Sequence, residues 1–557
     1  MYTSDKYNFE NVVPNKRRHL STNLKFKDQN DLIELDKKKN ILNFSKLVSN
    51  VILIIVMSFF LIILIKLQHV FFYSPDLYNI NKDFLQKNRG KIFDRNGELI
   101  ATNIDTKDFY LDTRRVLDKN NLKIKLKKIF PYKNDTYFEN IFSKKQYIKI
   151  KKYLTVNEQN QLKKVGDPGI MLHNSTKRIY LQHNLFSHLT GFKSSELKSK
   201  IEKNLDDKLK NGNDINLTLD LRIQHKVHEE LTKSLRLYNA SSAVAVVMDV
   251  NNGEIISLVS LPDFNPNHPE DIKAFSENNL AFEARYEMGS TLKIFNAALV
   301  YENNSQLEKN KFTIDSGYQI TSEKLIKDEH IKKNNLNFDE IFTKSSNVGS
   351  IKILESIGIE KQKSLFRKLG INDQISLYGL NVVKNRLPKN WDSQASKFIS
   401  YGYGISISPI SLVAAYASLV NGGFKIQPKI HRSSDFKKER IFKESTSKKI
   451  NFLLNEVVQN GTGKNAGVEG ISVGGKTGTS KKLENGNYSE NKVITSFIGA
   501  FPINSPKYLA FILFDEPRRN KSESLENFGG NTAAPTFSRV IKKIAPILNR
   551  SNYIKIE

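Results

Sequence analysis

The sequence predicts an α+β protein: an antiparallel sheet with helical flanks, a mixed β-containing pedestal before it, and one N-terminal transmembrane helix. Three observations support this prediction. An uncharged apolar run lies near the N-terminus, β-rich runs open and close the C-terminal part, and helical periodicity fills the segment between them. A chain of 557 residues exceeds one ordinary domain, so two or three domains are expected.

The apolar run covers residues 47–65 and lies between Lys46 and Lys66. At about 1.5 Å per residue, it just spans the hydrocarbon core of a bilayer. A buried core helix would show a polar face, and this run shows none. A cleaved signal peptide would end in small residues, whereas the sequence KLQH follows here. We therefore predict a single transmembrane anchor at residues 47–66.

The lysines beside the anchor predict its orientation. Four lie at positions 37–46, whereas after Lys66 few positive charges occur before Lys82. By the positive-inside rule, residues 1–46 are expected in the cytoplasm and everything after residue 66 outside it, as in a protein of the cell inner (plasma) membrane. The first 46 residues are polar and lack periodicity, so we expect a flexible tail.

The chain is strongly basic, with 86 Lys and Arg against 58 Asp and Glu and a net charge of +28. The lysines are spread over nearly every segment, many beside Asn and Ile, which favours a compositional bias over a nucleic-acid-binding surface. No zinc-ligand spacing accompanies the charge. Cysteine is absent, which excludes disulfides and thiolate metal sites. No cofactor, metal or nucleic-acid partner is predicted.

Residues 67–238 are predicted to form the pedestal. Its sequence RGKIFDRNG at 89–97 indicates a short strand that runs into an Asn-Gly turn. A second strand is expected at 215–220. Asp220 then has the position of an N-cap for a helix through Leu235.

A composition shift at residues 239–242 marks the start of the second domain, predicted at 239–557. The sequence NNGE joins its first two strands into a hairpin. The sequence NGTGKN at 460–465 lacks the spacing of a phosphate-binding loop and is predicted to be a turn. The predicted elements are strands at 243–250, 255–260, 496–501 and 509–515, a helix that begins at Ser408-Pro409 and ends at Asn421, and a closing helix at 533–549 that is bent or interrupted at Pro546.

Ser290 and Lys293 form one of several Ser-x-x-Lys pairs in this lysine-rich chain; others, such as Ser445 and Lys448, are expected on the surface. Ser290 follows Gly289 and precedes apolar residues at helical spacing, so we expect it at a helix N-terminus. Lys293 then lies one turn away on the same face, within hydrogen-bonding reach. Burial would lower the lysine pKa, so that the neutral amine can take the serine proton. The alternative for this pair is a capping serine with a lysine that extends to solvent.

Ser345-Ser346-Asn347 precedes an apolar helix that starts at Val348. A hydroxyl and a carboxamide on one turn can relay a proton and hold a peptide amide, although the motif alone is equally consistent with an N-cap.

Lys476-Thr477-Gly478-Thr479 contains the only Lys-Thr-Gly in the chain and has strand-like neighbours. Gly478 would let a substrate backbone approach the edge of the strand, where an extended peptide can pair by β-augmentation. Lys476 would supply positive charge for a carboxylate.

The three motifs in this order resemble the S-x-x-K, S-x-N and K-T-G signature of penicillin-binding proteins. The resemblance extends from Arg89 to Ile547 and is to class B, the monofunctional peptidoglycan transpeptidases. It implies a penicillin-binding transpeptidase domain on a non-catalytic, dimerisation-type pedestal. The chain departs from the family pattern at Leu181 and Met288, where the family often has proline.

The resemblance implies that Ser290 is the acylated nucleophile, Lys293 its general base and Ser345 a proton relay. The backbone N–H groups of Ser290 and Thr479 would form the oxyanion hole. The implied reaction attacks the penultimate D-Ala carbonyl of a stem pentapeptide, releases D-Ala and transfers the acyl group to an amine of a neighbouring strand. The implied substrate-binding residues are Asn347, Lys476, Thr477, Gly478 and Thr479.

Within class B, the segments 496–499, 515–517 and 529–535 resemble the septal (division) type more than the elongation type. The resemblance implies as partners the stem pentapeptide, β-lactams as covalent inhibitors, a membrane-embedded glycan polymerase and other division proteins. One alternative is a serine β-lactamase, against which the anchor and pedestal argue. The others are an elongation-type enzyme, or a membrane-anchored β-lactam sensor or division scaffold without turnover.

Overall fold

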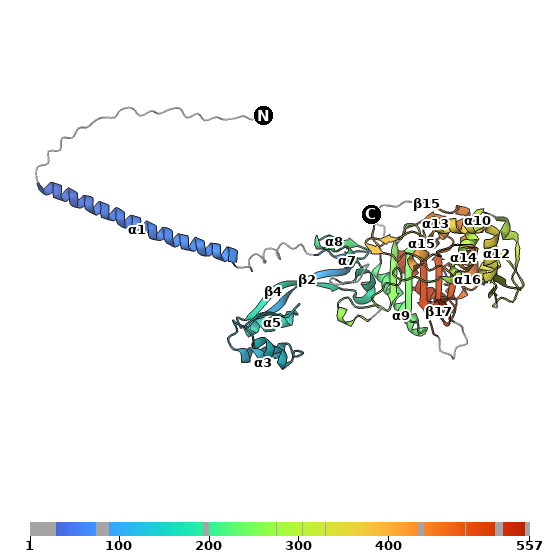
Figure 1. The fold of residues 1–557 in the computed structure, drawn as a ribbon, viewed down its shortest axis with the longest axis horizontal. Coiled ribbons are helices and arrows are strands. Elements are labelled where there is room, and N and C mark those ends of the chain that lie inside the picture. The colour runs from blue at the N-terminus through green and yellow to red at the C-terminus, as the bar shows by residue number, and fades with distance from the viewer. Residues whose placement is uncertain are drawn as a thin grey trace, which may run out of the picture. The chain divides into compact units, whose positions relative to one another are not determined.

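The computed structural model describes residues 29–73, 89–192, 200–273, 276–303, 305–328, 330–432, 439–484, 486–518 and 527–551. The chain divides after Gln86 into two units. In its described part, the first unit contains one helix, α1, and the second contains all the other helices and strands (Figure 1).

Helix α1 covers Gln29–Tyr73, and its segment Asn43–Gln68 is long and apolar enough to cross a membrane. The mean hydropathy there reaches 3.0, and none of the segment is buried within the protein. The predicted anchor is therefore a helix. The flexible tail was a wrong prediction for residues 29–46, because they contain no Gly or Pro to stop the helix from extending beyond the apolar segment. The tail prediction for residues 1–28 lies outside the described residues.

A five-stranded sheet forms the centre of the pedestal, with the order β3-β2-β1-β5 and with β4 paired to β2. The predicted strand and Asn-Gly turn at 89–97 are confirmed, since β1 pairs antiparallel with β2. The strand expected at 215–220 is shorter than predicted, because Leu217 already bridges to His431. The strands are β1 (Ile92–Phe93), β2 (Leu99–Asp112), β3 (Tyr147–Lys151), β4 (Ile170–Tyr180) and β5 (Ile215–Asn216).

The long strands β2 and β4 lie side by side and lead to helices that have a small core of their own (Figure 1). Phe109, Phe130 and Phe138 are fully buried in this core. Its helices are α3 (Lys119–Ile129), α4 (Asp135–Phe142) and α5 (Val156–Val165), each of which begins at a side-chain N-cap. The remaining pedestal elements are η1 (His183–Phe186), α6 (Ser187–Thr190), α7 (Ile201–Asn204) and α8 (Asp206–Lys210).

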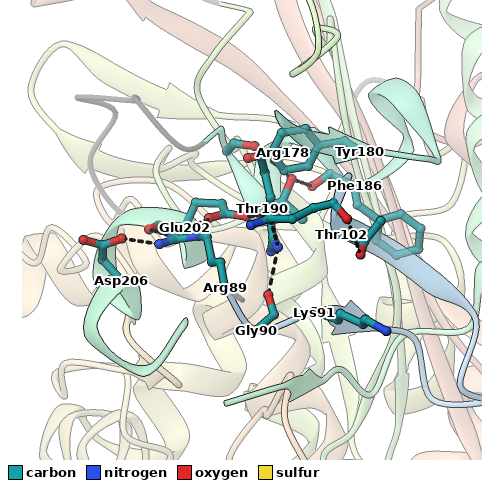
Figure 2. A network of polar contacts seen from close by, with 12 residues as sticks. Arg89, Gly90, Lys91, Thr102, Arg178, Tyr180, Phe186, Thr190, Glu202 and Asp206 are labelled. Atoms are coloured by element: carbon teal, nitrogen blue, oxygen red, sulfur yellow. Dashed lines mark hydrogen bonds and ion pairs between the residues drawn. The ribbon is translucent and has the colours of Figure 1, made fainter. Parts of the chain in front are cut away.

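A buried ionic network joins the residues just before β1 to β4, α7 and α8 (Figure 2). Arg89 donates to Glu202 Oε2 at 2.5 Å and to Asp206 Oδ1 at 2.6 Å, and Arg178 Nε donates to Glu202 Oε1 at 2.7 Å. Arg178 Nη1 also donates to the Gly90 carbonyl at 2.8 Å. Glu202 is 1% exposed. One buried carboxylate therefore balances two guanidinium groups from distant parts of the pedestal.

Replacing Glu202 with glutamine is expected to destabilise the pedestal by about 3–5 kcal/mol, because it leaves two buried guanidinium groups without their shared carboxylate. Hydrogen exchange of the β1 and β4 amides, measured on the full chain, should accelerate. Glu139→Gln is the matched control, since Glu139 pairs with Lys123 at 2.8 Å but its side chain is 63% exposed. That change should cost less than about 1 kcal/mol. Equal rates of hydrogen exchange at the β1 and β4 amides in the two variants would contradict the prediction.

The second sheet is antiparallel throughout, in the order β16-β17-β18-β6-β7. The predicted hairpin is confirmed as β6 and β7, and the two later predicted strands lie within β17 and β18. Strand β16, which carries the Lys-Thr-Gly motif, is an edge strand of this sheet. The strands are β6 (Ser242–Asp249), β7 (Ile255–Leu261), β16 (Gly474–Glu484), β17 (Asn487–Phe501) and β18 (Tyr508–Asp515).

Helices cover both faces of this sheet, because alternate residues of a strand point to opposite sides. Ala245 of β6 packs in one core with α9 (Leu221–Leu237) and α17 (Ala533–Ser551). Val246 packs in the other core, with α10 (Ile294–Asn303), α12 (Asn347–Ile357), α15 (Pro409–Val420) and α16 (Glu444–Asn460). The predicted antiparallel sheet with helical flanks is therefore confirmed.

The helix caps in this domain also follow the sequence. The Asp220 side chain accepts from Arg222 N at the start of α9, and the Ser408 side chain accepts from Ser411 N at the start of α15. Helix α17 contains Pro546 without ending there. The remaining elements are η2 (Pro269–Asp271), η3 (Gly289–Lys293), η4 (Ser305–Lys309), η5 (Lys464–Ala466), α11 (Phe338–Thr343), α13 (Ile359–Lys368), α14 (Ser393–Ser400), β8 (Lys311–Thr313), β9 (Tyr318–Thr321), β10 (Lys324–Ile326), β11 (Asn335–Asn337), β12 (Ser376–Leu377), β13 (Leu380–Asn381), β14 (Phe424–Lys425) and β15 (Glu439–Arg440).

Candidate active site

Ser290 lies in the 3-10 turn η3, which leads directly into α10. The predicted helix start is confirmed, although its first turn is 3-10. Gly289 has φ +53°, and a Cβ at this position would overlap the Thr479 carbonyl oxygen of β16. Only glycine combines this backbone conformation with so close an approach. The half-buried Ser290 is thereby held next to Thr479.

Gly478 of β16 lies on the sheet side of the same contact between η3 and β16. A Cβ there would overlap Ser496 Oγ and lie 2.8 Å from both the Met288 carbonyl oxygen and a methyl carbon of Thr291. The expected approach of a substrate backbone to this strand stays a prediction, and the structure shows a second reason for glycine here. Its small size lets the turn that carries Ser290 pack against β16.

Lys293 is fully buried, and its Nζ donates to the Ser345 carbonyl at 2.5 Å and to Ser345 Oγ at 3.3 Å. Burial lowers the pKa of Lys293 to about 7, and the negative charge of Asp328 acts in the opposite direction. The expected hydrogen bond to Ser290 is not formed, because the amine is directed toward Ser345. Among the described residues, the Ser290 hydroxyl has no hydrogen-bond partner.

The Ser445 and Lys448 pair has different surroundings, as predicted. Lys448, three residues after Ser445, lies on α16 with a 74% exposed side chain. It forms an ion pair with Glu444, one turn earlier in the same helix. Burial therefore distinguishes Lys293 from a lysine with the same local sequence.

In the Ser345-Ser346-Asn347 turn, only one of the three side chains caps the helix that follows. Ser346 is the N-cap of α12, and its hydroxyl accepts from Gly349 N at 2.8 Å. Ser345 precedes it with φ +62°, a left-handed conformation that is unusual for a residue with a Cβ. Asn347 is the first helical residue, half-buried, and its carboxamide has no partner in the part of the chain that is described. The N-cap role therefore belongs to Ser346 and not to Ser345 or Asn347.

Lys476 reaches the same hydroxyl from β16. Its Nζ is fully buried and donates to Ser345 Oγ at 3.0 Å, so the Ser345 hydroxyl lies between two lysine amines. Burial lowers the pKa of Lys476 well below its ordinary value, and the positive charge of Lys293 lowers it further. Thr477 Oγ1 shares a 2.8 Å hydrogen bond with Thr462 Oγ1, which ties β16 to the turn after α16.

Three segments that are far apart in the sequence thus meet in one place. Hydrogen bonds join Lys293, Ser345 and Lys476, and the packing of η3 on β16 places Ser290 beside Thr479. The Gly289 N–H donates to the Gly402 carbonyl at 3.1 Å, so the segment 401–404, with the sequence YGYG, also borders the site.

Asp328, which is 6% exposed, also belongs to this site and was not predicted. Its carboxylate accepts from Ser346 Oγ at 2.5 Å, Asn347 N at 2.7 Å and Val348 N at 3.2 Å. It lies in a lysine-rich connection between β10 and β11, where no motif or spacing marks it.

One cluster in the described part of the chain has the donor spacing for a metal ion, namely His268, Glu270 and Asp271. All three side chains are exposed, and none belongs to the site above.

Comparison with protein families agrees with this arrangement. The penicillin binding protein transpeptidase domain matches residues 243–542, and the penicillin-binding protein dimerisation domain matches residues 85–215. The chain therefore belongs to the penicillin-binding protein transpeptidase family, in its class B. Within this class it is most like the peptidoglycan D,D-transpeptidases of the FtsI type.

Three relatives illustrate the similarity. The chain is 30% identical over 483 residues to the probable peptidoglycan D,D-transpeptidase FtsI of Caulobacter vibrioides, covering 83% of this chain and 81% of that protein. It is 28% identical over 495 residues to the probable peptidoglycan D,D-transpeptidase PenA of Neisseria meningitidis, with 82% and 84% covered. It is 27% identical over 558 residues to the stage V sporulation protein D of Bacillus subtilis, with 89% and 85% covered.

Proposed function

We propose that this D,D-transpeptidase cross-links peptidoglycan stem peptides through an acyl-enzyme on Ser290. The observation that carries this proposal is the Ser345 hydroxyl held between two buried lysine amines, at 3.3 Å from Lys293 and 3.0 Å from Lys476. A lysine whose pKa is lowered to about 7 can act as a general base at neutral pH. Ser290 lies one 3-10 turn from that base.

In the proposed reaction, the neutral Lys293 amine takes the Ser290 proton as Oγ attacks the penultimate D-Ala carbonyl. The backbone N–H groups of Ser290 and Thr479 stabilise the oxyanion. The bond to the terminal D-Ala then breaks, and its amine receives a proton through the Ser345 hydroxyl. An acceptor amine finally attacks the acyl carbon, forms the cross-link amide, gives up its proton and restores the Ser290 hydroxyl.

Substrate binding is proposed along β16. As an edge strand of the sheet, β16 can pair with an extended peptide. Asn347 would hold the peptide amide, and Lys476 and Thr477 the terminal carboxylate. Burial and the charge of Lys293 disfavour the charged form of Lys476. An arriving carboxylate favours that form, so the amine gains its charge as the donor binds.

The cellular role is proposed on similarity and charge. Residues 1–46 would lie in the cytoplasm, 47–66 in the membrane, and the pedestal (67–238) and transpeptidase domain (239–557) outside it. We infer a septal role in cell division, with a membrane-embedded glycan polymerase and other division proteins as partners. The septal role is supported by the similarity to FtsI-type proteins. It is a proposal because the chain is also similar to PenA and to a sporulation protein.

The test uses the full chain in detergent, incubated with donor pentapeptide and an amine acceptor, and mass spectrometry of the products. Release of D-Ala with formation of a cross-linked amide is expected. Stable acylation by penicillin without any cross-link would instead indicate a sensor or scaffold, and rapid loss of the penicilloyl group a β-lactamase. In cells, depletion should give filaments; rounded cells would contradict the septal role.

A further inference from the structure

Asp328 acts on two parts of the site, the turn that follows Ser345 and the buried amine of Lys293. Its Oδ2 accepts from the Ser346 hydroxyl at 2.5 Å and from Val348 N at 3.2 Å, and its Oδ1 accepts from Asn347 N at 2.7 Å. The carboxylate therefore receives three donors from consecutive residues of the turn that follows Ser345. A carboxylate with three such bonds fixes the turn in one conformation.

The turn needs this support because Ser345 has φ +62°. A residue with a Cβ persists in the left-handed region only where its surroundings impose that conformation. Once in place, the conformation directs the Ser345 carbonyl to Lys293 Nζ and its hydroxyl to both lysine amines. The carboxylate of Asp328 thus acts on the reacting groups through the backbone of residues 345–348.

The same carboxylate supplies the negative charge that the buried site requires. Lys293 and Lys476 are both 0% exposed, and the charge of Lys293 disfavours the charged form of Lys476 by like-charge repulsion. Of the titratable groups on the elements packed around Lys293, Lys476 comes from β16 and Asp328 from the connection before β11. Asp328 is the group whose charge favours protonated Lys293.

We propose that Asp328 is a positioning residue for the transpeptidase reaction, which holds the Ser345–Asn347 turn and balances the charge of the buried lysine pair. This inference rests on the proposed function of the same site. Asp328 does not contact the reacting atoms. It sets the direction of the Ser345 hydroxyl and the pH range in which Lys293 is a free base.

The test measures acylation of the full-length protein in detergent by a fluorescent penicillin, as a rate constant between pH 5 and 9. Asp328→Asn removes the charge and one of the two acceptor oxygens, and Asp328→Glu keeps the charge but moves it by one methylene. Asp220→Asn is the matched control, because Asp220 is a 1% exposed carboxylate that accepts from the start of α9, and its ion pair is with Arg222.

Both Asp328 variants should reduce the acylation rate at high pH by about 10–100-fold, because the Ser345 hydroxyl is misplaced. In Asp328→Asn the rise of the rate with pH should also move to lower pH, since loss of a negative charge makes Lys293 easier to deprotonate. Asp328→Glu should retain the wild-type pH profile, and Asp220→Asn should retain both rate and profile.

Melting temperatures identify variants that fail to fold; if Asp328→Asn fails, the lower rate of folded Asp328→Glu remains the test. A wild-type rate and profile in the folded variants would overturn the role of Asp328. No labelling of the wild-type protein would instead refute the proposed function, which separates the two failures.

Discussion

Alanine at position 290 is expected to abolish covalent labelling by penicillin and formation of the cross-link, while the protein remains folded. Ser290 Oγ is the atom that would bond to the acyl group, and neither lysine nor Ser345 offers an equivalent nucleophile at the start of η3. Removing a catalytic nucleophile lowers turnover by more than about 10⁴-fold. The hydroxyl has no hydrogen-bond partner among the described residues, so its removal breaks no contact that stabilises the fold.

The measurement is fluorescent penicillin labelling of membranes that contain the variant at wild-type abundance, together with its melting temperature. Ser445→Ala provides the matched control, because Ser445 has the same spacing to Lys448 but lies exposed on α16. It should label like the wild type. Labelling that survives in Ser290→Ala would refute the assignment of the nucleophile.

The transpeptidase sheet was predictable because its strands have strong local patterns. Strands β6 and β18 are short, apolar and bounded by turn residues, and hairpin geometry fixes β7 as the antiparallel neighbour of β6 and β17 as that of β18. The caps at Asp220 and Ser408 were predictable for the same reason, since a capping side chain acts within its own turn.

The pedestal was less predictable. Strand β2 has the sequence LIATNIDTKDFYLD, and its exposed middle does not show a clear alternation of apolar and polar residues. Its stability comes from pairing with β4 from Ala101 to Leu111, across a long stretch of intervening chain. Such a partner cannot be identified from local sequence. The length of α1 was not predicted, because the polar residues 29–46 were expected to lack structure. Extending an existing helix avoids the cost of nucleation, so the apolar segment can continue into these residues as helix.

In the candidate site, the residues that meet were predictable from the sequence, but the contacts that orient them were not. The order of three short motifs predicted which side chains should meet, and Lys293, Ser345 and Lys476 do meet. The contacts that orient them were not predictable. The Lys293 amine bonds to Ser345 rather than Ser290, because Ser345 adopts φ +62° and Asp328 holds the turn that follows. Both features depend on a tertiary contact between segments without a recognisable motif.

Arginine at position 293 is expected to reduce acylation by about 10²–10⁴-fold, although it keeps the positive charge and can still donate to the Ser345 carbonyl. The reason is that a guanidinium group does not lose its proton in a protein, so it cannot accept the proton of Ser290. The wild-type rate should rise with pH through the pKa of Lys293, about 7, and become level above it, because only the neutral amine is a base.

In Lys293→Arg this rise should be absent, and the small remaining rate should not change between pH 6 and 8. Lys448→Arg is the control, since Lys448 has the same spacing to a serine but is 74% exposed and ion-paired on the surface. Its rate and pH profile should equal those of the wild type. If Lys293→Arg kept a rise near pH 7, the titrating base would have to be another group. Lys476 would then be the candidate, because it is also buried and also reaches Ser345 Oγ.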